Sequence, residues 1–205
     1  MIIEHAAPEV FVVDDDIAIC DAISALLRSI GMRVRTFSSG SRFLLAAQEI
    51  PPNCVILDVR LQGESGLDLP LQMQQRNIYS PIVFISGHGD IQMSVAAMKA
   101  GALDFLVKPF RDQELLDAVT VSIRENVEHR KQTLKLKTLR SRYSTLSPRE
   151  RQVMGHAVSG LINKQIAAVL GLSEVTVKIH RKQAMDKMQA GTFAELVKME
   201  VLLSG

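Results

Sequence analysis

Acidic, hydroxyl and amino side chains stand at the ends of four short apolar stretches of this chain. In chain order they are Asp14 with Asp15, Asp58, Ser86 and Lys108. Adjacent acids can hold a hard divalent cation, because Mg²⁺ takes one or two carboxylates, several waters and a phosphate oxygen. A carboxylate can also attack phosphorus to form an aspartyl phosphate, while a metal ion and an ammonium group neutralise charge on the transferred group. These residue types therefore indicate metal-assisted phosphoryl transfer to an aspartate.

Each of these side chains has a task in that chemistry. Asp14 and Asp15 are expected to bind the metal ion, and Asp58 is either a further ligand or the group that reacts. Lys108 supplies the ammonium group, and Ser86 can donate a hydrogen bond to a phosphoryl oxygen. Taken singly, an Asp after a strand is usually a cap or turn residue, and one Lys at a sheet edge is usually a surface charge. Their joint occurrence at successive strand ends argues against coincidence.

The apolar stretches are predicted to be the strands of a parallel sheet. The run 54–57 lies between Pro51-Pro52-Asn53 and a glycine loop, and its apolar residues are typical of a strand buried on both faces. Alternating strands and helices favour a parallel sheet with right-handed crossovers, which binds ligands at the carboxyl edge of its strands. The predicted strands are Val10–Val13, Val34–Phe37, Cys54–Asp58, Ile82–Ile85 and Phe105–Val107.

Length and charge indicate two domains with different partners. The 205 residues suit a domain of about 120 residues and a smaller one. Residues 1–124 hold 10 Lys and Arg against 15 Asp and Glu, whereas residues 125–205 hold 14 against 7. This division indicates a metal or phosphate site in the first part and a polyanion partner for the second, although charge alone would favour simple variation of a solvated surface.

The cysteines and the chain start bear on the cellular compartment. Cys20 and Cys54 fall where small buried side chains are expected, and they are predicted to be reduced core residues, not a disulfide or a metal site. Residues 1–7 lack a basic leader followed by an apolar core, and no uncharged apolar run approaches about 18 residues. The protein is therefore expected to be cytoplasmic, with no membrane partner.

The segment 91–100 is apolar on two helical faces. One face carries Ile91, Val95 and Met98, and the other carries Met93, Ala97 and Ala100. Such a helix is either deeply buried or offers one face to a partner. The sequence leaves both alternatives open.

Helical signals continue through the rest of the chain. No glycine or proline occurs between Asp112 and Pro148, and residues 129–142 contain six Lys or Arg and no acid, which favours a basic helix that frays near residues 141–144. A helix with a Ser147–Glu150 capping box is predicted next. The predicted caps of three further helices are Asn163, Ser173 and Thr192. Two short helices joined by a tight glycine turn, the second rich in Lys and Arg, indicate a helix-turn-helix.

Over roughly residues 8–125 the chain resembles the receiver domain of two-component response regulators. The motifs that carry the resemblance are Val13-Asp14-Asp15, Leu57-Asp58, Ile85-Ser86-Gly87 and Val107-Lys108-Pro109-Phe110. The resemblance implies a flavodoxin-like, doubly wound α/β fold with a five-stranded parallel sheet in the order 2-1-3-4-5. It also implies a cis Lys108-Pro109 bond. Gln62 departs from the pattern, because the family usually has proline in that loop.

The resemblance further implies roles for individual residues. Asp58 is the phosphoacceptor, and the implied ligands of Mg²⁺ or Mn²⁺ are Asp14, Asp15, Asp58 and the backbone carbonyl of Arg60. The implied switch and phosphate contacts are Ser86, Phe105 and Lys108. In this hypothesis Ser86 moves toward the phosphoryl group and Phe105 rotates into the vacated space. Without the resemblance, Phe105 would be interpreted as a passive core aromatic.

Roughly residues 144–203 resemble the LuxR/NarL-type helix-turn-helix. The matching segments include Leu146-Ser147-Pro148-Arg149-Glu150-Arg151, Asn163-Lys164-Gln165-Ile166-Ala167 and Thr176-Val177-Lys178-Ile179-His180. The third helix is expected to enter the major groove. The residues expected nearest to base edges are Val175, Lys178, Ile179 and Lys182, and the expected phosphate contacts are Asn163, Lys164, Thr176 and Arg181. Gly191 departs from the Arg or Lys that is usual in the family.

Together the two resemblances imply a FixJ-like transcription regulator. The expected domains are a receiver at 1–125, a helical basic linker at 126–143 and a helix-turn-helix DNA-binding domain at 144–205. Phosphorylated on Asp58, the chain is expected to dimerise and bind promoter DNA. It is expected to be a phosphoacceptor that assists its own Mg²⁺-dependent transfer, and not an enzyme. The expected partners are a sensor histidine kinase, double-stranded DNA, a second copy of the chain and, as a further candidate, RNA polymerase.

Two other functions fit some of these residues. A Mg²⁺-dependent phosphohydrolase also forms an aspartyl phosphate, but such folds place the nucleophile on the first strand and a pair of acids near the end, which is the reverse of the order here. A binding module whose receiver dimerises without taking phosphate is the second alternative, and the presence of all acceptor and metal groups argues against it. Nucleotide binding is disfavoured, because the sequence has no Walker loop and no G-x-G-x-x-G.

Overall fold

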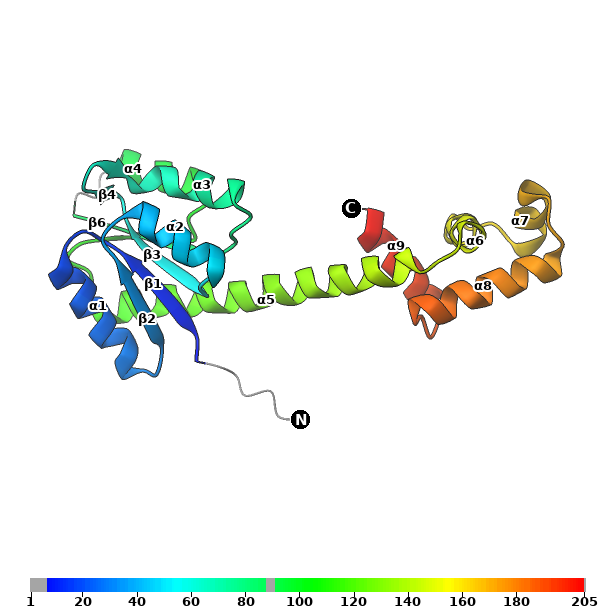
Figure 1. Ribbon diagram of the computed structural model, residues 1–205, viewed down its shortest axis with the longest axis horizontal. Coiled ribbons are helices and arrows are strands. Elements are labelled where there is room, and N and C mark those ends of the chain that lie inside the picture. Colours follow the sequence, from blue (N-terminus) through cyan, green and yellow to red (C-terminus); the bar gives the residue numbers. More distant parts are fainter. Residues whose placement is uncertain (1–6, 88–90, 205) are drawn as a thin grey trace. The chain divides into compact units, whose positions relative to one another are not determined.

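The computed structural model describes residues 7–87 and 91–204 (Figure 1). The chain divides into two compact units, residues 1–129 and residues 130–205. Within the described ranges, no helix combines the length and the apolar character that crossing a bilayer requires.

The first unit is built on a five-stranded parallel sheet. Its strands are β1 (Glu9–Val13), β2 (Arg33–Phe37), β3 (Cys54–Asp58), β6 (Ile82–Ser86) and β7 (Asp104–Val107). They lie in the order β2-β1-β3-β6-β7, which confirms the order 2-1-3-4-5 expected for a flavodoxin-like α/β fold. Every residue of β3 and β6 is buried, as the uninterrupted apolar runs predict for strands covered on both faces.

Register brings the polar strand ends to one edge of the sheet. Val13 pairs with Leu57, Asp58 with Ile85, and Ser86 with Val107. Residues 14, 58, 86 and 108 therefore lie at the same carboxyl edge, each at or directly after the end of its strand.

Helices cover both faces of the sheet (Figure 1). One face packs against α2 (Gly40–Glu49), α3 (Leu69–Gln75) and α4 (Ile91–Lys99), with Phe11, Phe43 and Phe84 in the core between them. The other face packs against α1 (Ile17–Ser29) and the first part of α5 (Asp112–Ser144). Burying a single large apolar side chain contributes about 1.5–3 kcal/mol, so both layers stabilise the sheet.

Helix α4 buries only one of its two apolar faces. Ala97 is fully buried and Met93 packs against the core, whereas Ile91 is 82% exposed and Met98 52% exposed. The alternative that residues 91–100 form a deeply buried helix is therefore wrong.

Several local expectations are also confirmed. Cys20 and Cys54 are buried and free, and burial raises the pKa of both thiols, to about 11 and about 12 respectively. The peptide bond between Lys108 and Pro109 is cis.

The loop after β3 forms a small antiparallel hairpin from β4 (Arg60–Leu61) and β5 (Glu64–Ser65), followed by the single 3₁₀ turn η1 (Gly66–Asp68). Glu64 Oε1 accepts a hydrogen bond from the Gly40 backbone N–H at 2.5 Å, which fastens the hairpin to the start of α2. The same loop contains Gln62 in place of the proline that is usual in the family. The hydrogen bond between Gly40 and Glu64 therefore fixes a loop that lacks this proline.

The second unit contains the end of α5 and the helices α6 (Pro148–Val158), α7 (Asn163–Leu170), α8 (Glu174–Met188) and α9 (Phe193–Ser204). The Ser147–Glu150 capping box forms as predicted, and Ser173 and Thr192 accept hydrogen bonds from Thr176 N and Glu195 N.

The predicted cap at Asn163 is wrong. Asn163 is the first residue inside α7, and the Gln165 side chain accepts the hydrogen bond from the backbone N–H of Ile162 before it. The Asn163 amide oxygen instead accepts from Arg181 of α8. Because Asn163 lies inside the first turn of α7, its side chain can reach the neighbouring helix α8. Asn163 therefore links α7 to α8 and does not cap a helix.

Candidate functional site

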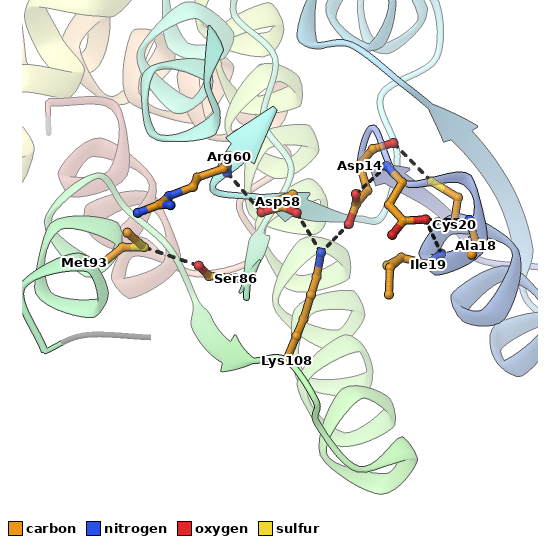
Figure 2. A network of polar contacts seen from close by, with 10 residues as sticks. Asp14, Ala18, Ile19, Cys20, Asp58, Arg60, Ser86, Met93 and Lys108 are labelled. Atoms are coloured by element: carbon orange, nitrogen blue, oxygen red, sulfur yellow. Dashed lines mark hydrogen bonds and ion pairs between the residues drawn. The ribbon is translucent and has the colours of Figure 1, made fainter. Parts of the chain in front are cut away.

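Lys108 joins two carboxylates at the carboxyl edge of the sheet (Figure 2). Its Nζ donates to Asp14 Oδ2 at 2.6 Å and to Asp58 Oδ2 at 2.7 Å. Asp14 is 2% exposed, Asp58 is 8% exposed and the Lys108 side chain is 17% exposed, so these ion pairs are screened little by water. The fold thus brings Lys108 into contact with two acids that lie 94 and 50 residues before it in the sequence.

The acids form a group that can bind a metal ion. Carboxylate oxygens of Asp14, Asp15 and Asp58 lie within 4.8 Å of one another, and Asp15 is exposed. Asp14 Oδ1 accepts from Asp16 N at 2.9 Å, and Asp58 Oδ1 accepts from Arg60 N at 3.0 Å. These bonds orient the two buried carboxylates, and such an all-oxygen group suits a hard divalent cation.

The charges at the site are only partly balanced. Burial raises the pKa of the Asp14 carboxyl, and the hydrogen bond from Lys108 only partly offsets this. Burial lowers the pKa of the Lys108 ammonium, but hydrogen bonds to Asp14 and Asp58 outweigh it, so this pKa lies above its ordinary value. One ammonium group serves two carboxylates, which leaves each acid incompletely compensated. A divalent cation would supply the missing positive charge.

Ser86 lies at the same edge, but its hydroxyl group does not turn toward the acids. Ser86 is 1% exposed, and its Oγ donates to Met93 Sδ on α4 at 3.3 Å (Figure 2). Phe105 is half-buried against the core on the α4 side of the sheet. Sequence reasoning placed Met93 on an apolar helical face and missed this contact, because a thioether is a weak acceptor that hydrophobic periodicity does not reveal.

The predicted DNA contacts fall into two groups on the second unit. Four of them project from exposed positions of α8, and they are Val175, Lys178, Ile179 and Lys182. Lys164 of α7 is exposed as well.

The remaining three predicted contacts are engaged within the unit. Arg181 donates to Asn163 Oδ1 at 3.1 Å, and its guanidinium carbon lies 4.2 Å from the centre of the Phe193 ring. Thr176 Oγ1 shares a hydrogen bond with Ser173 Oγ at 2.8 Å.

A doubly wound sheet with a lysine and acids at its carboxyl edge, in one chain with a helix-turn-helix unit, is the architecture of a signal-receiving transcription regulator. A family model described as the response regulator receiver domain matches residues 10–120, and one described as bacterial regulatory proteins, luxR family, matches residues 144–200. This chain belongs to the response regulators of two-component systems, with a receiver domain followed by a LuxR-type DNA-binding domain.

Similar proteins share this architecture over nearly their whole length. Nodulation protein W of Bradyrhizobium diazoefficiens is 48% identical over 194 residues, 95% of this chain and 86% of that protein. The transcriptional regulatory protein FixJ of Azorhizobium caulinodans is 40% identical over 193 residues, 94% of this chain and 92% of FixJ. The solved structure of the response regulator StyR matches this chain with a TM-score of 0.81 and 44% sequence identity. The match covers 96% of this chain and 99% of the StyR chain.

Proposed function

We propose that this response regulator accepts a phosphoryl group on Asp58 from a phosphohistidine of a sensor kinase. The observation that carries the proposal is the position of Lys108, whose Nζ contacts both Asp14 and Asp58. In the transfer an Asp58 oxygen forms a bond to phosphorus while the bond between phosphorus and the histidine nitrogen breaks. Lys108 then neutralises charge on the phosphoryl oxygens.

The proposed metal ligands are Asp14, Asp15, Asp58 and the backbone carbonyl of Arg60. The close approach of the three carboxylates supports this assignment. Bound Mg²⁺ or Mn²⁺ would supply positive charge beside the transferred oxygens. Asp14 and Asp58 are oriented by backbone N–H groups, and their hydrogen bonds with Lys108 hold the pKa of its ammonium group above the ordinary value.

Phosphorylation is proposed to act through Ser86 and Phe105 on the exposed face of α4. That face carries Ile91, Val95 and Met98, and Val107 of β7, which is 46% exposed, lies on the same face of its strand as Phe105. One hydrogen bond to a charged group contributes about 1.5–3 kcal/mol, whereas reversing a 1:99 equilibrium needs about 5.5 kcal/mol. Ser86 is therefore insufficient alone, and the Lys108 ion pair and dimerisation through this face together supply the remainder.

The second unit is proposed to bind promoter DNA with α8 in the major groove. Val175, Lys178, Ile179 and Lys182 are the proposed base-edge residues, and the proposed phosphate contacts are Asn163, Lys164, Thr176 and Arg181. The exposure of the four base-edge residues and of Lys164 supports their assignments. RNA polymerase is a further proposed partner of the DNA-bound dimer.

The test compares the full chain with its Asp58→Asn variant. Acetyl phosphate with Mg²⁺ should label the wild-type chain, convert it to a dimer and tighten DNA binding, and it should do none of these to Asp58→Asn. A phosphodonor-dependent dimer of Asp58→Asn would refute the mechanism. Steady turnover of phosphate esters would instead favour the phosphohydrolase alternative.

A further inference from the structure

The Ser86 hydroxyl group has a defined direction in the structure. Its Oγ donates to Met93 Sδ at 3.3 Å, and Figure 2 shows this bond on the side of Ser86 away from Asp58. Because Ser86 is 1% exposed, protein atoms and not bulk water set that direction. A thioether sulfur is an uncharged and weak acceptor. Its hydrogen bond can therefore be exchanged readily for one to an anion.

Met93 also helps to hold α4 against the core of the domain. It is partly buried against the core cluster that contains Ala97 of the same helix, whereas Ile91 and Met98 on the other face are largely exposed. A side chain that packs beneath α4 and also accepts from Ser86 ties the position of this helix to the direction of the hydroxyl group.

We propose that Met93 is a positioning residue that holds the Ser86 hydroxyl group in its resting direction. This inference rests on the proposed function, because it names the resting partner of the proposed switch hydroxyl. A phosphoryl oxygen on Asp58 carries charge, and charge-assisted hydrogen bonds are roughly twice as strong as neutral ones. On phosphorylation the hydroxyl group exchanges the Met93 sulfur for a phosphoryl oxygen, and α4 loses one contact with the sheet edge.

The first test removes the acceptor and keeps the packing. Met93→Leu nearly conserves side-chain volume but lacks the sulfur, so it weakens the resting arrangement and leaves the phosphorylated one unchanged. The full-length variant with Mg²⁺ should bind beryllofluoride, a phosphoryl analogue, roughly five- to tenfold more tightly than the wild type. Calorimetry or ¹⁹F NMR measures this affinity. Met32→Leu makes the same chemical change at a partly buried position on the other face of the sheet, directly before β2, and should leave the affinity unchanged.

A double-mutant cycle separates hydrogen bonding from packing. In a Ser86→Ala background Met93→Leu should no longer change the beryllofluoride affinity, because no hydroxyl group remains to be held. The ¹³C-labelled methyl resonance of Met93 should shift on beryllofluoride binding in the wild type and should shift much less in Ser86→Ala.

Three results would overturn the inference. One is an unchanged affinity of Met93→Leu. Another is an equal effect of Met93→Leu in the wild-type and Ser86→Ala backgrounds, which would assign the effect to packing. In both cases a wild-type chain that binds beryllofluoride leaves the proposed function intact. A wild-type chain that binds none, with Mg²⁺ present, overturns the proposed function and this inference together.

Discussion

The backbone of Gly66 lies directly against the carbonyl group of Asp58. A Cβ atom at position 66 would overlap the Asp58 carbonyl oxygen and would crowd the Cα atom of Val59 at 3.2 Å. The Gly66 N–H donates to Val59 O at 2.8 Å, which fixes this approach. The proposed acceptor therefore depends on a residue without a side chain in the loop that follows it.

Gly66→Ala should destabilise the receiver domain by about 2 kcal/mol or more, because backbone atoms must move to admit the methyl group. Labelling of Asp58 by acetyl phosphate should slow as well, since the same loop positions the Asp58 carboxylate through Arg60 N. Urea denaturation and labelling kinetics measure the two effects. Normal stability would show that the loop adapts to the methyl group.

Gly155→Ala should have the opposite effect on the second unit. Gly155 lies inside α6, and a Cβ atom there would meet nothing within 4 Å. Ala stabilises a helix interior by about 1 kcal/mol relative to Gly. Nothing in the structure explains why Gly stands at this position. The midpoint of urea denaturation should rise, and a fall would reveal a contact that the isolated chain does not show.

Asp14→Asn should stabilise the metal-free receiver domain at neutral pH. Burial raises the pKa of Asp14, so its ionised form opposes folding, and the amide removes that charge. The variant should also lose the response to Mg²⁺. For the wild type, Mg²⁺ at one hundred times its Kd should add about 2.7 kcal/mol to the unfolding free energy, reversibly with EDTA. Thermal melts with and without Mg²⁺ check both effects, and equal Mg²⁺ responses would exclude Asp14 as a ligand.

The second unit should lose stability in acid through Glu150. Burial acts to raise the pKa of this carboxyl, but Lys187 Nζ at 2.7 Å and the Ser147 backbone N–H together hold it below its ordinary value of 4.5. The stabilisation is present above the pKa of the unfolded chain and disappears as pH falls through the lower folded pKa. Denaturation between pH 7 and pH 3 should show this loss.

A neutral variant tests the assignment to Glu150. Glu150→Gln should cost about 2 kcal/mol at pH 7, less than a fully buried pair, because Lys187 is 40% exposed. The acid-dependent loss should be smaller in this variant. Glu174→Gln, an exposed change in the same unit, should stay within about 0.5 kcal/mol. An unchanged pH profile of Glu150→Gln would assign the acid sensitivity elsewhere.

Lys178 and Arg181 of α8 should separate DNA binding from folding. Lys178 is exposed, so Lys178→Ala should weaken DNA binding and reduce the salt slope by about one unit without changing the melting temperature. Arg181 joins Asn163 and Phe193, so Arg181→Ala should also lower the melting temperature. Binding titrations at several salt concentrations, with melts of the same variants, measure both effects. If Lys178→Ala left the salt dependence of DNA binding unchanged, Lys178 would not be a DNA contact.

Much of the fold follows from local signals in the sequence. The apolar runs of β3 and β6 predict strands buried on both faces, and the Ser147–Glu150 pair predicts the start of α6. The cap at Asn163 could not be predicted in the same way. Asn is a good cap by composition, but its actual partner is Arg181, 18 residues away on another helix. The residue type determines which hydrogen bonds a side chain can form, whereas the packing of the helices determines which partner lies within reach.

The order of residue types along the chain was enough to specify the chemical groups of the proposed site and their common edge, because alternating strands and helices make a parallel sheet whose polar ends face one way. Three features are decided only by the tertiary structure: Lys108 is shared by Asp14 and Asp58, one face of α4 stays exposed, and Ser86 donates a hydrogen bond to Met93. Such features depend on side-chain directions and on packing between distant segments, and residue spacing along the chain specifies neither.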